Sequence, residues 1–207
     1  MISDIKMPDS NIVREAEELA RSTSSLMLFN HVMRCYWFSE LFAQRENSKA
    51  DREQIFLSSV LHDLGFTDAG RGPNRFEIEG AHAARKFLLG RGVSDQRAWE
   101  VWTTIALHTW DMNLFKQDDA RLTEMGILYD VVGVPGAKLD PADVAEIVRR
   151  YPRLGFKHGF YEMLREDSKK EGYPHFFHIC TCIAAHEPCS VVIPDARERI
   201  NAAPFDE

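Results

Sequence analysis

Apolar residues along this chain recur at intervals of three and four positions, and few stretches alternate apolar and polar residues as a strand does. Intervals of three and four place the apolar side chains on one face of an α-helix. The pattern therefore predicts an all-α fold. The expected helices cover roughly 11–21, 25–44, 51–64, 77–91, 95–109, 119–130, 141–150, 157–171 and 176–187.

Polar residues, glycine and proline mark several of the expected helix ends. Asp51 can cap the third helix, and Gly65 follows its last turn. Pro141 occupies the first turn of a later helix, directly after the possible cap Asp140. No Pro-rich or Gly/Ser-rich segment divides the chain, so its 207 residues are expected to form one domain.

Composition and charge narrow the class of protein. The hydrophobic fraction of 44% and the charged fraction of 28% are those of an ordinary soluble protein. No stretch approaches the roughly 18 apolar residues that span a bilayer, and the polar start of the chain does not resemble a signal peptide. We therefore expect a cytoplasmic protein without a membrane partner. A formal net charge of −7 argues against nucleic acid as the partner and leaves a small-molecule substrate.

A histidine and an aspartate stand side by side in the segment Leu61-His62-Asp63-Leu64, at the end of an apolar run. Neighbouring residues lie about 100° apart around a helix, but at a helix C-terminus both side chains can turn toward a metal beyond the last turn. The position before Gly65 fits such an end. Imidazole and carboxylate together suit Zn, Mn, Fe, Co or Ni, which predicts a divalent transition metal as cofactor.

Two further residues are candidate ligands. His31 lies on an apolar stripe with Leu28 and Val32, where it is either an inward-pointing ligand or a hydrogen-bonded core residue. Asp130 lies between apolar residues on both sides in the sequence. A buried carboxylate needs a partner, because an unpaired buried charge costs several kcal/mol, and a metal ion is a suitable one.

The order His31, His62-Asp63, Asp130 resembles the H…HD…D signature of the HD superfamily of metal-dependent phosphohydrolases. The flanking residues resemble the subgroup that includes the cyanamide hydratases of fungi. Four segments carry this likeness: Asn30-His31-x-x-Arg34, Leu61-His62-Asp63-Leu64-Gly65, Arg75-Phe76-Glu77-x-x-Gly80-Ala81 and Ala106-Leu107-His108-Thr109. The resemblance implies a helical bundle with a central metal.

The resemblance also implies that His31, His62, Asp63 and Asp130 bind this metal, within a core of about residues 25–135. Superfamily members with two metals use two more histidines between the HD pair and the last aspartate. His82 and His108 lie in that interval, so one or two ions per chain are both possible. A pair of ions would favour phosphoester chemistry, because it can hold both the attacking and the leaving oxygen.

The metal would lower the pKa of a bound water and so supply a nucleophile near neutral pH. Asp63 is then a candidate proton acceptor as well as a ligand. Arg34 is expected either to hold phosphate oxygens or to form an ordinary ion pair, as are Arg75 and Lys86. Glu77 is expected either to orient a water or a ligand histidine or to form a structural ion pair. His108, with Thr109, is the other candidate catalytic group.

Three functions fit these residues. The first is a metal-dependent hydrolase of a phosphomonoester or nucleotide-like compound, and the second is a cyanamide-hydratase-like lyase that hydrates a small nitrile. A small apolar pocket would favour the second, and a wide basic pocket the first. The third is a non-catalytic binding module in which the metal only stabilises the fold.

The C-terminal part of the chain is expected to pack its helices, about 140–190, over the metal core as a cap or lid. Its apolar surface also makes a homodimer possible. Cys180, Cys182 and Cys189 lie near two histidines, as reduced thiols or as a second zinc site. Trp110, Phe66 and Phe76 are candidates for the walls of a small dry pocket.

Overall fold

The computed structural model describes residues 2–109, 117–133, 138–170 and 195–207. The described residues form nine α-helices and two short 3-10 helices and contain no strand, which confirms the all-α prediction. The helices are α1 (Asn11–Thr23), α2 (Leu26–Arg45), α3 (Arg52–Leu61), α4 (Phe76–Gly90), α5 (Asp95–Leu107), α6 (Asp118–Val132), α7 (Pro141–Arg150), α8 (Phe156–Asp167) and α10 (Ala196–Asn201). The 3-10 helices are η1 (Ile2–Asp4) and η2 (Leu64–Phe66).

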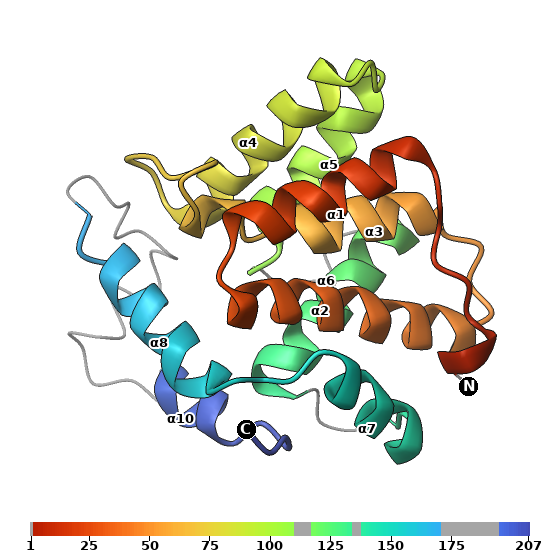
Figure 1. Cartoon of the computed structure of the whole chain (residues 1–207), viewed down its shortest axis with the longest axis vertical. Coiled ribbons are helices and arrows are strands. Elements are labelled where there is room, and N and C mark those ends of the chain that lie inside the picture. Colours follow the sequence, from red (N-terminus) through yellow and green to blue (C-terminus); the bar gives the residue numbers. More distant parts are fainter. Residues whose placement is uncertain (1, 110–116, 134–137, 171–194) are drawn as a thin grey trace, which may run out of the picture.

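Helix α2 is the centre of the bundle. The stretch Leu28–Ala43 is buried throughout, so this helix is covered on every side. In Figure 1, α1 and α3 lie above it and α6 passes behind it. Helices α4 and α5 form a hairpin at the top, and α7, α8 and α10 lie below. A helix in this position brings any polar side chain it carries into the interior, where that side chain needs a partner.

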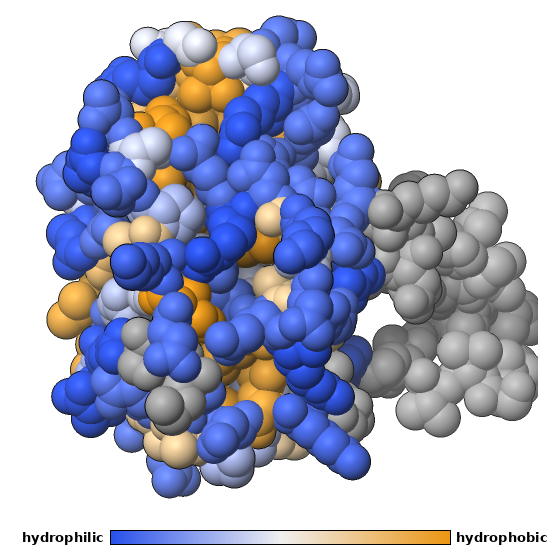
Figure 2. Space-filling model, turned by 90° about the vertical axis from the view of Figure 1, so that its right-hand side faces the viewer, coloured by the Kyte–Doolittle hydropathy of each residue, from blue (hydrophilic) through white to orange (hydrophobic). Residues whose placement is uncertain are grey.

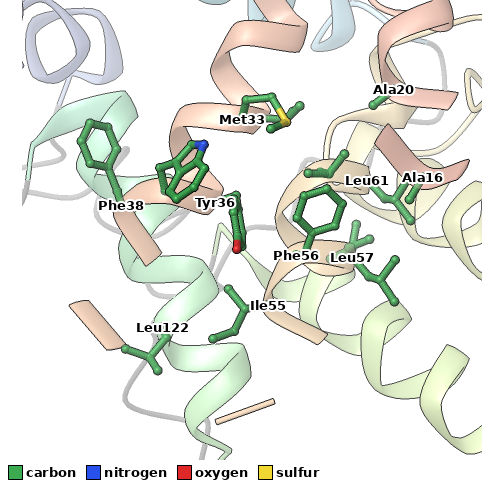
Figure 3. Close-up of a cluster of buried hydrophobic side chains, with 14 of the residues drawn as sticks. Ala16, Ala20, Met33, Tyr36, Phe38, Ile55, Phe56, Leu57, Leu61 and Leu122 are labelled. Atoms are coloured by element: carbon green, nitrogen blue, oxygen red, sulfur yellow. The ribbon is translucent and has the colours of Figure 1, made fainter. Parts of the chain in front are cut away.

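The apolar core joins α1, α2, α3 and α6. Figure 3 shows Ala16 and Ala20 of α1 next to Leu57 and Leu61 of α3. Tyr36 of α2 meets Phe56 at a ring-centroid distance of 4.9 Å in an edge-to-face arrangement. Aromatic pairs of this geometry add stabilisation beyond the burial of their area. This packing fixes α2 against α3, the two helices that carry His31 and His62.

The face shown in Figure 2 is mostly hydrophilic, with small apolar patches between the charged side chains. Many of these charges are paired, for example Arg121 with Glu46 and Arg97 with Asp51. No helix among the described residues is long and apolar enough to cross a membrane.

The predictions for the helix starts at Asp51 and Asp140 are confirmed. Oδ1 of Asp51 accepts hydrogen bonds from the backbone N–H groups of Glu53 and Gln54, at 2.9 and 3.0 Å. Oδ1 of Asp140 accepts one from Ala142, and Pro141 occupies the first turn of α7. Such caps satisfy N–H groups that have no partner within the helix. The segment predicted as a helix at 51–64 ends earlier, at Leu61, and continues through a turn into η2.

The expectations for the C-terminal part of the chain have different outcomes. The helices expected at 141–150 and 157–171 are present as α7 and α8. The helix expected at 176–187 lies outside the described residues, as do Cys180, Cys182, Cys189 and Trp110. The division into a metal core and a cap therefore stays a prediction for that segment.

Close packing of α6 on α2 depends on Gly126. A Cβ atom at this position would lie 2.7 Å from the backbone nitrogen of Ser39 and closer still to the carbonyl oxygen of Cys35. We expect Gly126→Ala to lower the free energy of unfolding by about 1–3 kcal/mol, because backbone atoms of α2 must move to accept the methyl group. Chemical denaturation measures the change. Gly90→Ala is the control, since a Cβ atom there meets nothing within 4 Å, and an equal loss in both variants would contradict the packing argument.

Candidate metal centre

Four side chains from three segments of the chain lie close together in the interior. His31 comes from the middle of α2, and His62 and Asp63 lie in the turn between α3 and η2. His108 is the residue that follows the last turn of α5. All four are buried, with relative exposures of 3% or less. His62 and Asp63 therefore lie at a helix C-terminus, as the sequence predicted.

Backbone hydrogen bonds orient two of the histidines. Nδ1 of His62 lies 2.7 Å from the carbonyl oxygen of Ser59, and Nδ1 of His108 lies 2.6 Å from that of Ile105. A carbonyl oxygen accepts only, so the proton of each ring is on Nδ1 and the lone pair is on Nε2. This is the tautomer that a metal-binding histidine adopts when its other nitrogen donates to the backbone.

Asp63 lies between the histidine rings. Its Oδ2 atom is 3.4 Å from Nε2 of His31 and 3.3 Å from Nε2 of His62. Ligand atoms bound tetrahedrally at about 2.0–2.1 Å from one ion are roughly 3.3–3.4 Å apart. Two groups of ligand atoms lie within 4.8 Å of one another: one from His62, Asp63 and His108, and one from His31, Cys35 and His62, so that His62 belongs to both.

Several polar atoms of this cluster are buried without a hydrogen bond among the described residues. They are Nε2 of His62, both carboxylate oxygens of Asp63 and Oε2 of Glu77. Nearly all buried polar groups in proteins have a partner, and a convergent set without one needs an explanation. A divalent cation would satisfy lone pairs on nitrogen and oxygen together, so the donor set fits a transition metal.

Burial shifts the pKa values of these groups in the direction that favours their neutral forms. Burial, with the nearby His31, lowers the pKa of His62 to about 3. Burial, with the nearby His62, also lowers the pKa of His108 to about 3. Burial raises the pKa of Asp63 to about 7, although His31 acts in the opposite direction. Both histidines are therefore neutral at physiological pH, which is the form that binds metal.

Asp130 lies on the opposite side of His31 from Asp63. Its Oδ2 atom is 2.7 Å from Nδ1 of His31, whereas Asp63 faces Nε2. The sequence interpretation made Asp130 a direct ligand. In the structure it accepts a hydrogen bond from His31 instead. A carboxylate that accepts from one ring nitrogen of a histidine orients the other ring nitrogen toward a metal.

Two buried arginines share the same carboxylate. Arg34 donates from Nε to Oδ1 and from Nη2 to Oδ2 of Asp130, both at 2.8 Å. Arg153 donates from Nη1 to Oδ1 at 2.9 Å. Burial alone would raise the pKa of Asp130, but Arg34 and His31 outweigh it and hold that pKa well below its usual range.

These contacts correct one expectation for Arg34. Its side chain is fully buried and donates hydrogen bonds to Asp130 and to the carbonyl oxygens of Tyr151 and Pro152. It is therefore not placed to hold substrate phosphate, and the ion-pair alternative is the one observed. The other two cations do not replace it, because Lys86 is exposed on α4 and Arg75 donates to the carbonyl oxygen of Ala106.

His82 is also placed away from the cluster. It is exposed on α4, and its Nδ1 atom accepts a hydrogen bond from the indole N–H of Trp102 at 3.2 Å. Among the described residues, His82 thus belongs to no group of candidate ligands, and the structure gives no support to a second metal bound by it. The spacing of apolar residues along α4 already indicates that His82 points away from the core. The buried positions of this helix include Ala81 and Ala84, and His82 lies outside their stripe.

His108, in contrast, continues the buried stripe of α5. Val101, Thr104 and Ile105 are buried on this helix, and a residue three or four positions later lies on the same face. Sequence reasoning could thus have separated the two histidines by phase alone.

Glu77 lies beside the cluster at the start of α4. Its Oε1 atom accepts a hydrogen bond from the Thr109 hydroxyl at 2.8 Å, a contact that the sequence did not predict. A Cβ atom on Gly80 would lie 2.8 Å from the carbonyl oxygen of His62, so α4 approaches the HD turn closely. Glycine at this position lets Glu77 come near Asp63.

Three residues around His31 gave no clear signal in the sequence. Phe156 stacks on the imidazole at 4.5 Å between ring centroids, and Phe160 lies at 5.4 Å. The Sγ atom of Cys35 is 3.5 Å from Nδ1 of His31. Burial and the charge of Asp130 raise the pKa of this thiol well above its usual value, so it stays protonated beside the ring.

A cavity of about 250 Å³ opens onto the cluster. Its walls are mostly apolar. The described lining residues are His62, Phe76, His108, Thr109, Ile127, Leu128, Val131, Val132, Phe160, Leu164, Ala196, Arg199 and Ile200. The prediction that Phe76 walls a pocket agrees with this lining, and Phe66 stacks behind it at 4.1 Å.

Comparison with known proteins names no relative. No family model matches the chain, and no curated protein matches it. The geometry of the site therefore carries the functional argument.

Proposed function

We propose that this protein is a metal-dependent enzyme that adds water to a small substrate, with a nitrile of the cyanamide type as the best candidate. The observation that carries the proposal is the apolar cavity of about 250 Å³ lined by His62 and His108. A small apolar pocket was the feature expected of a hydratase, and a wide basic one that of a phosphohydrolase. The resemblance to HD proteins remains in agreement with the proposal.

His31, His62, Asp63 and His108 would hold the metal. When bound there, a divalent metal supplies a nucleophile by lowering the pKa of water. Asp130 keeps the proton of His31 on Nδ1, so that Nε2 stays available toward Asp63. Neither oxygen of Asp63 has a hydrogen-bond donor among the described residues, so one of them can accept a proton from the attacking water.

Glu77 and the cavity walls act on the same reaction. Glu77 is buried beside Asp63 and is oriented by Thr109, which makes it a candidate to position water through its Oε2 atom. Phe76 and Phe160 keep bulk water out. In nitrile hydration the water oxygen bonds to the nitrile carbon, and both water protons end on the nitrogen of the product amide.

The hydrolysis of a phosphomonoester or nucleotide-like compound is the second candidate. The superfamily resemblance still favours it, but Arg34 is committed to Asp130 and the described cavity holds one arginine only, Arg199. A phosphate dianion near the metal would lack the buried cationic clamp that phosphoryl transfer uses. A non-catalytic metal-stabilised module remains the third.

The test is to incubate metal-loaded protein separately with cyanamide and with p-nitrophenyl phosphate. The proposal predicts formation of urea from cyanamide and no release of nitrophenol. Phosphate release without hydration would reverse the order of the two candidates. The protein could also be folded and metal-loaded and yet turn over neither compound nor other short nitriles. That result would support the hypothesis of a non-catalytic module instead.

Metal affinity is expected to depend on pH through Asp63. Because the pKa of this carboxyl is about 7 without metal, binding below pH 7 must displace one proton. The apparent affinity should therefore fall about tenfold for each pH unit below 7 and level off above it. His62 and His108, with pKa values of about 3, stay neutral and add nothing between pH 7 and about pH 5. Competition with a chelator of known pH dependence measures this, and a constant affinity over that interval would contradict it.

A further inference from the structure

We infer that Arg199 is a specificity-determining residue. It binds a carboxylate at the end of the substrate that lies farthest from the metal. The substrate class is then a small amphipathic acid: a reactive group, a short apolar chain and a carboxylate. The inference rests on the proposed function for its reactive group, but the binding of the carboxylate end can be measured separately.

The cavity has two chemically different ends. His62 and His108 are almost fully buried, with exposures of 1% and 3%, and lie at its inner end. Arg199 on α10 is exposed, so it lies where the same cavity reaches the surface. The walls between them carry aliphatic side chains such as Val131 and Leu164. A ligand that spans the cavity meets neutral imidazole, then apolar surface, then a guanidinium.

Arg199 is the one charged side chain among the described lining residues. No aspartate or glutamate lines the described cavity wall, and no ion pair to Arg199 occurs within the described parts of the chain. Other surface arginines are paired, for example Arg91 with Glu15 and Arg85 with Asp95. An arginine beside apolar walls in a chain of net charge −7 is available to a carboxylate ligand, which it can hold through two parallel hydrogen bonds.

The exposed position separates this role from phosphoryl chemistry. An arginine that stabilises a reacting phosphate must lie close to the metal, in the water-excluded part of the site. Arg199 is exposed, whereas Phe160 and Ile200 of the same cavity are buried, with exposures of 5% and 2%. The anionic group that it recognises is therefore the part of the ligand that does not react.

The experiment measures binding of straight-chain carboxylates, from acetate to hexanoate, by calorimetry, with the primary amide of each chain length as the uncharged comparison. Wild type is expected to bind each carboxylate about tenfold more tightly than its amide, with affinity rising about threefold per added methylene. Arg199→Gln should remove the difference between acid and amide. Arg197→Gln is the matched control, because this exposed arginine of α10 lies over the Tyr161 ring and does not line the cavity.

A second arm tests whether the metal itself takes the carboxylate. The titrations are repeated on protein treated with a chelator, and the preference for acid over amide should persist in wild type and be absent in Arg199→Gln. A preference that disappears on chelation but survives in Arg199→Gln would assign the carboxylate to the metal and overturn the inference. Equal loss in the Arg197 and Arg199 variants would also overturn it. Neither result depends on turnover, so the hydratase proposal can fail while the carboxylate site stands.

Discussion

Asp130→Ala is expected to lower the free energy of unfolding by about 3–5 kcal/mol, a large part of the roughly 5–15 kcal/mol that holds a domain of this kind together. The reason is the pair of arginines that this carboxylate serves. Arg34 and Arg153 both have fully buried side chains, and Asp130 accepts three hydrogen bonds from them. Removing the carboxylate leaves two buried cations without their shared anion. Urea denaturation of protein prepared with chelator measures the loss without a contribution from bound metal.

The control is Glu146→Ala on α7. Glu146 also pairs with two arginines, Arg149 and Arg150, but its side chain is partly exposed to solvent, at 29%, and both arginines are exposed. Water screens such pairs, so this variant should unfold close to wild type. If Asp130→Ala does not fold, Asp130→Asn keeps the side-chain shape and one acceptor and should show a smaller loss in the same direction. An Asp130→Asn protein with wild-type stability would contradict the account of the buried pair.

Asp63→Asn is expected to abolish turnover and weaken metal binding by more than about a hundredfold. Loss of a group that only orients a ligand typically costs 10–100-fold, and Asp63 is placed as a ligand itself. The same substitution should leave the metal-free protein at least as stable as wild type. Burial raises the pKa of Asp63 to about 7, so the ionised carboxylate is disfavoured in the fold, and a neutral amide avoids that cost.

Asp63→Asn is thus expected to lose function without a loss of metal-free stability, and this combination makes the prediction specific. Metal affinity and cyanamide turnover report on function, and denaturation with chelator present reports on stability. Ser58→Ala is a useful comparison, because Ser58 is buried on α3 close in sequence to Asp63 but is not a ligand. Full turnover in Asp63→Asn would remove Asp63 from the site. A marked loss of metal-free stability would show that its role is structural.

Most of the fold follows from sequence periodicity. The expected helix ends differ from the observed ones mainly by a few residues, because apolar spacing and capping residues such as Asp51 and Asp140 are local signals. The end of α3 is the exception of functional interest. The chain leaves the helix after Leu61 so that His62 and Asp63 can turn inward, which periodicity alone did not place.

The candidate site was predicted in part. Residue chemistry and the HD resemblance selected His31, His62 and Asp63, and the structure brings these together. The partners of Asp130 could not be predicted, because Arg153 reaches it from a loop between α7 and α8 that has no regular pattern. Long-range ion pairs of this kind depend on tertiary packing rather than on spacing in the chain.

The arginine on the cavity rim was missed for a similar reason. Arg199 lies in a short helix far along the chain from the HD motif, and only the fold places α10 against α6 and α8. A charged residue on such a helix ordinarily lies in solvent. Its proximity to the cavity became visible only with the lining residues of the cavity in place.

We expect His108, and not His82, to complete a single metal site with His31, His62 and Asp63. The direct measurement is the metal content per chain by elemental analysis of wild type, His108→Ala and His82→Ala, purified without affinity-tag metal and reconstituted with Zn or Mn. About one ion per chain is expected in wild type and in His82→Ala, and a strongly reduced content in His108→Ala. Loss of an ion in His82→Ala, or wild-type content and affinity in His108→Ala, would contradict it.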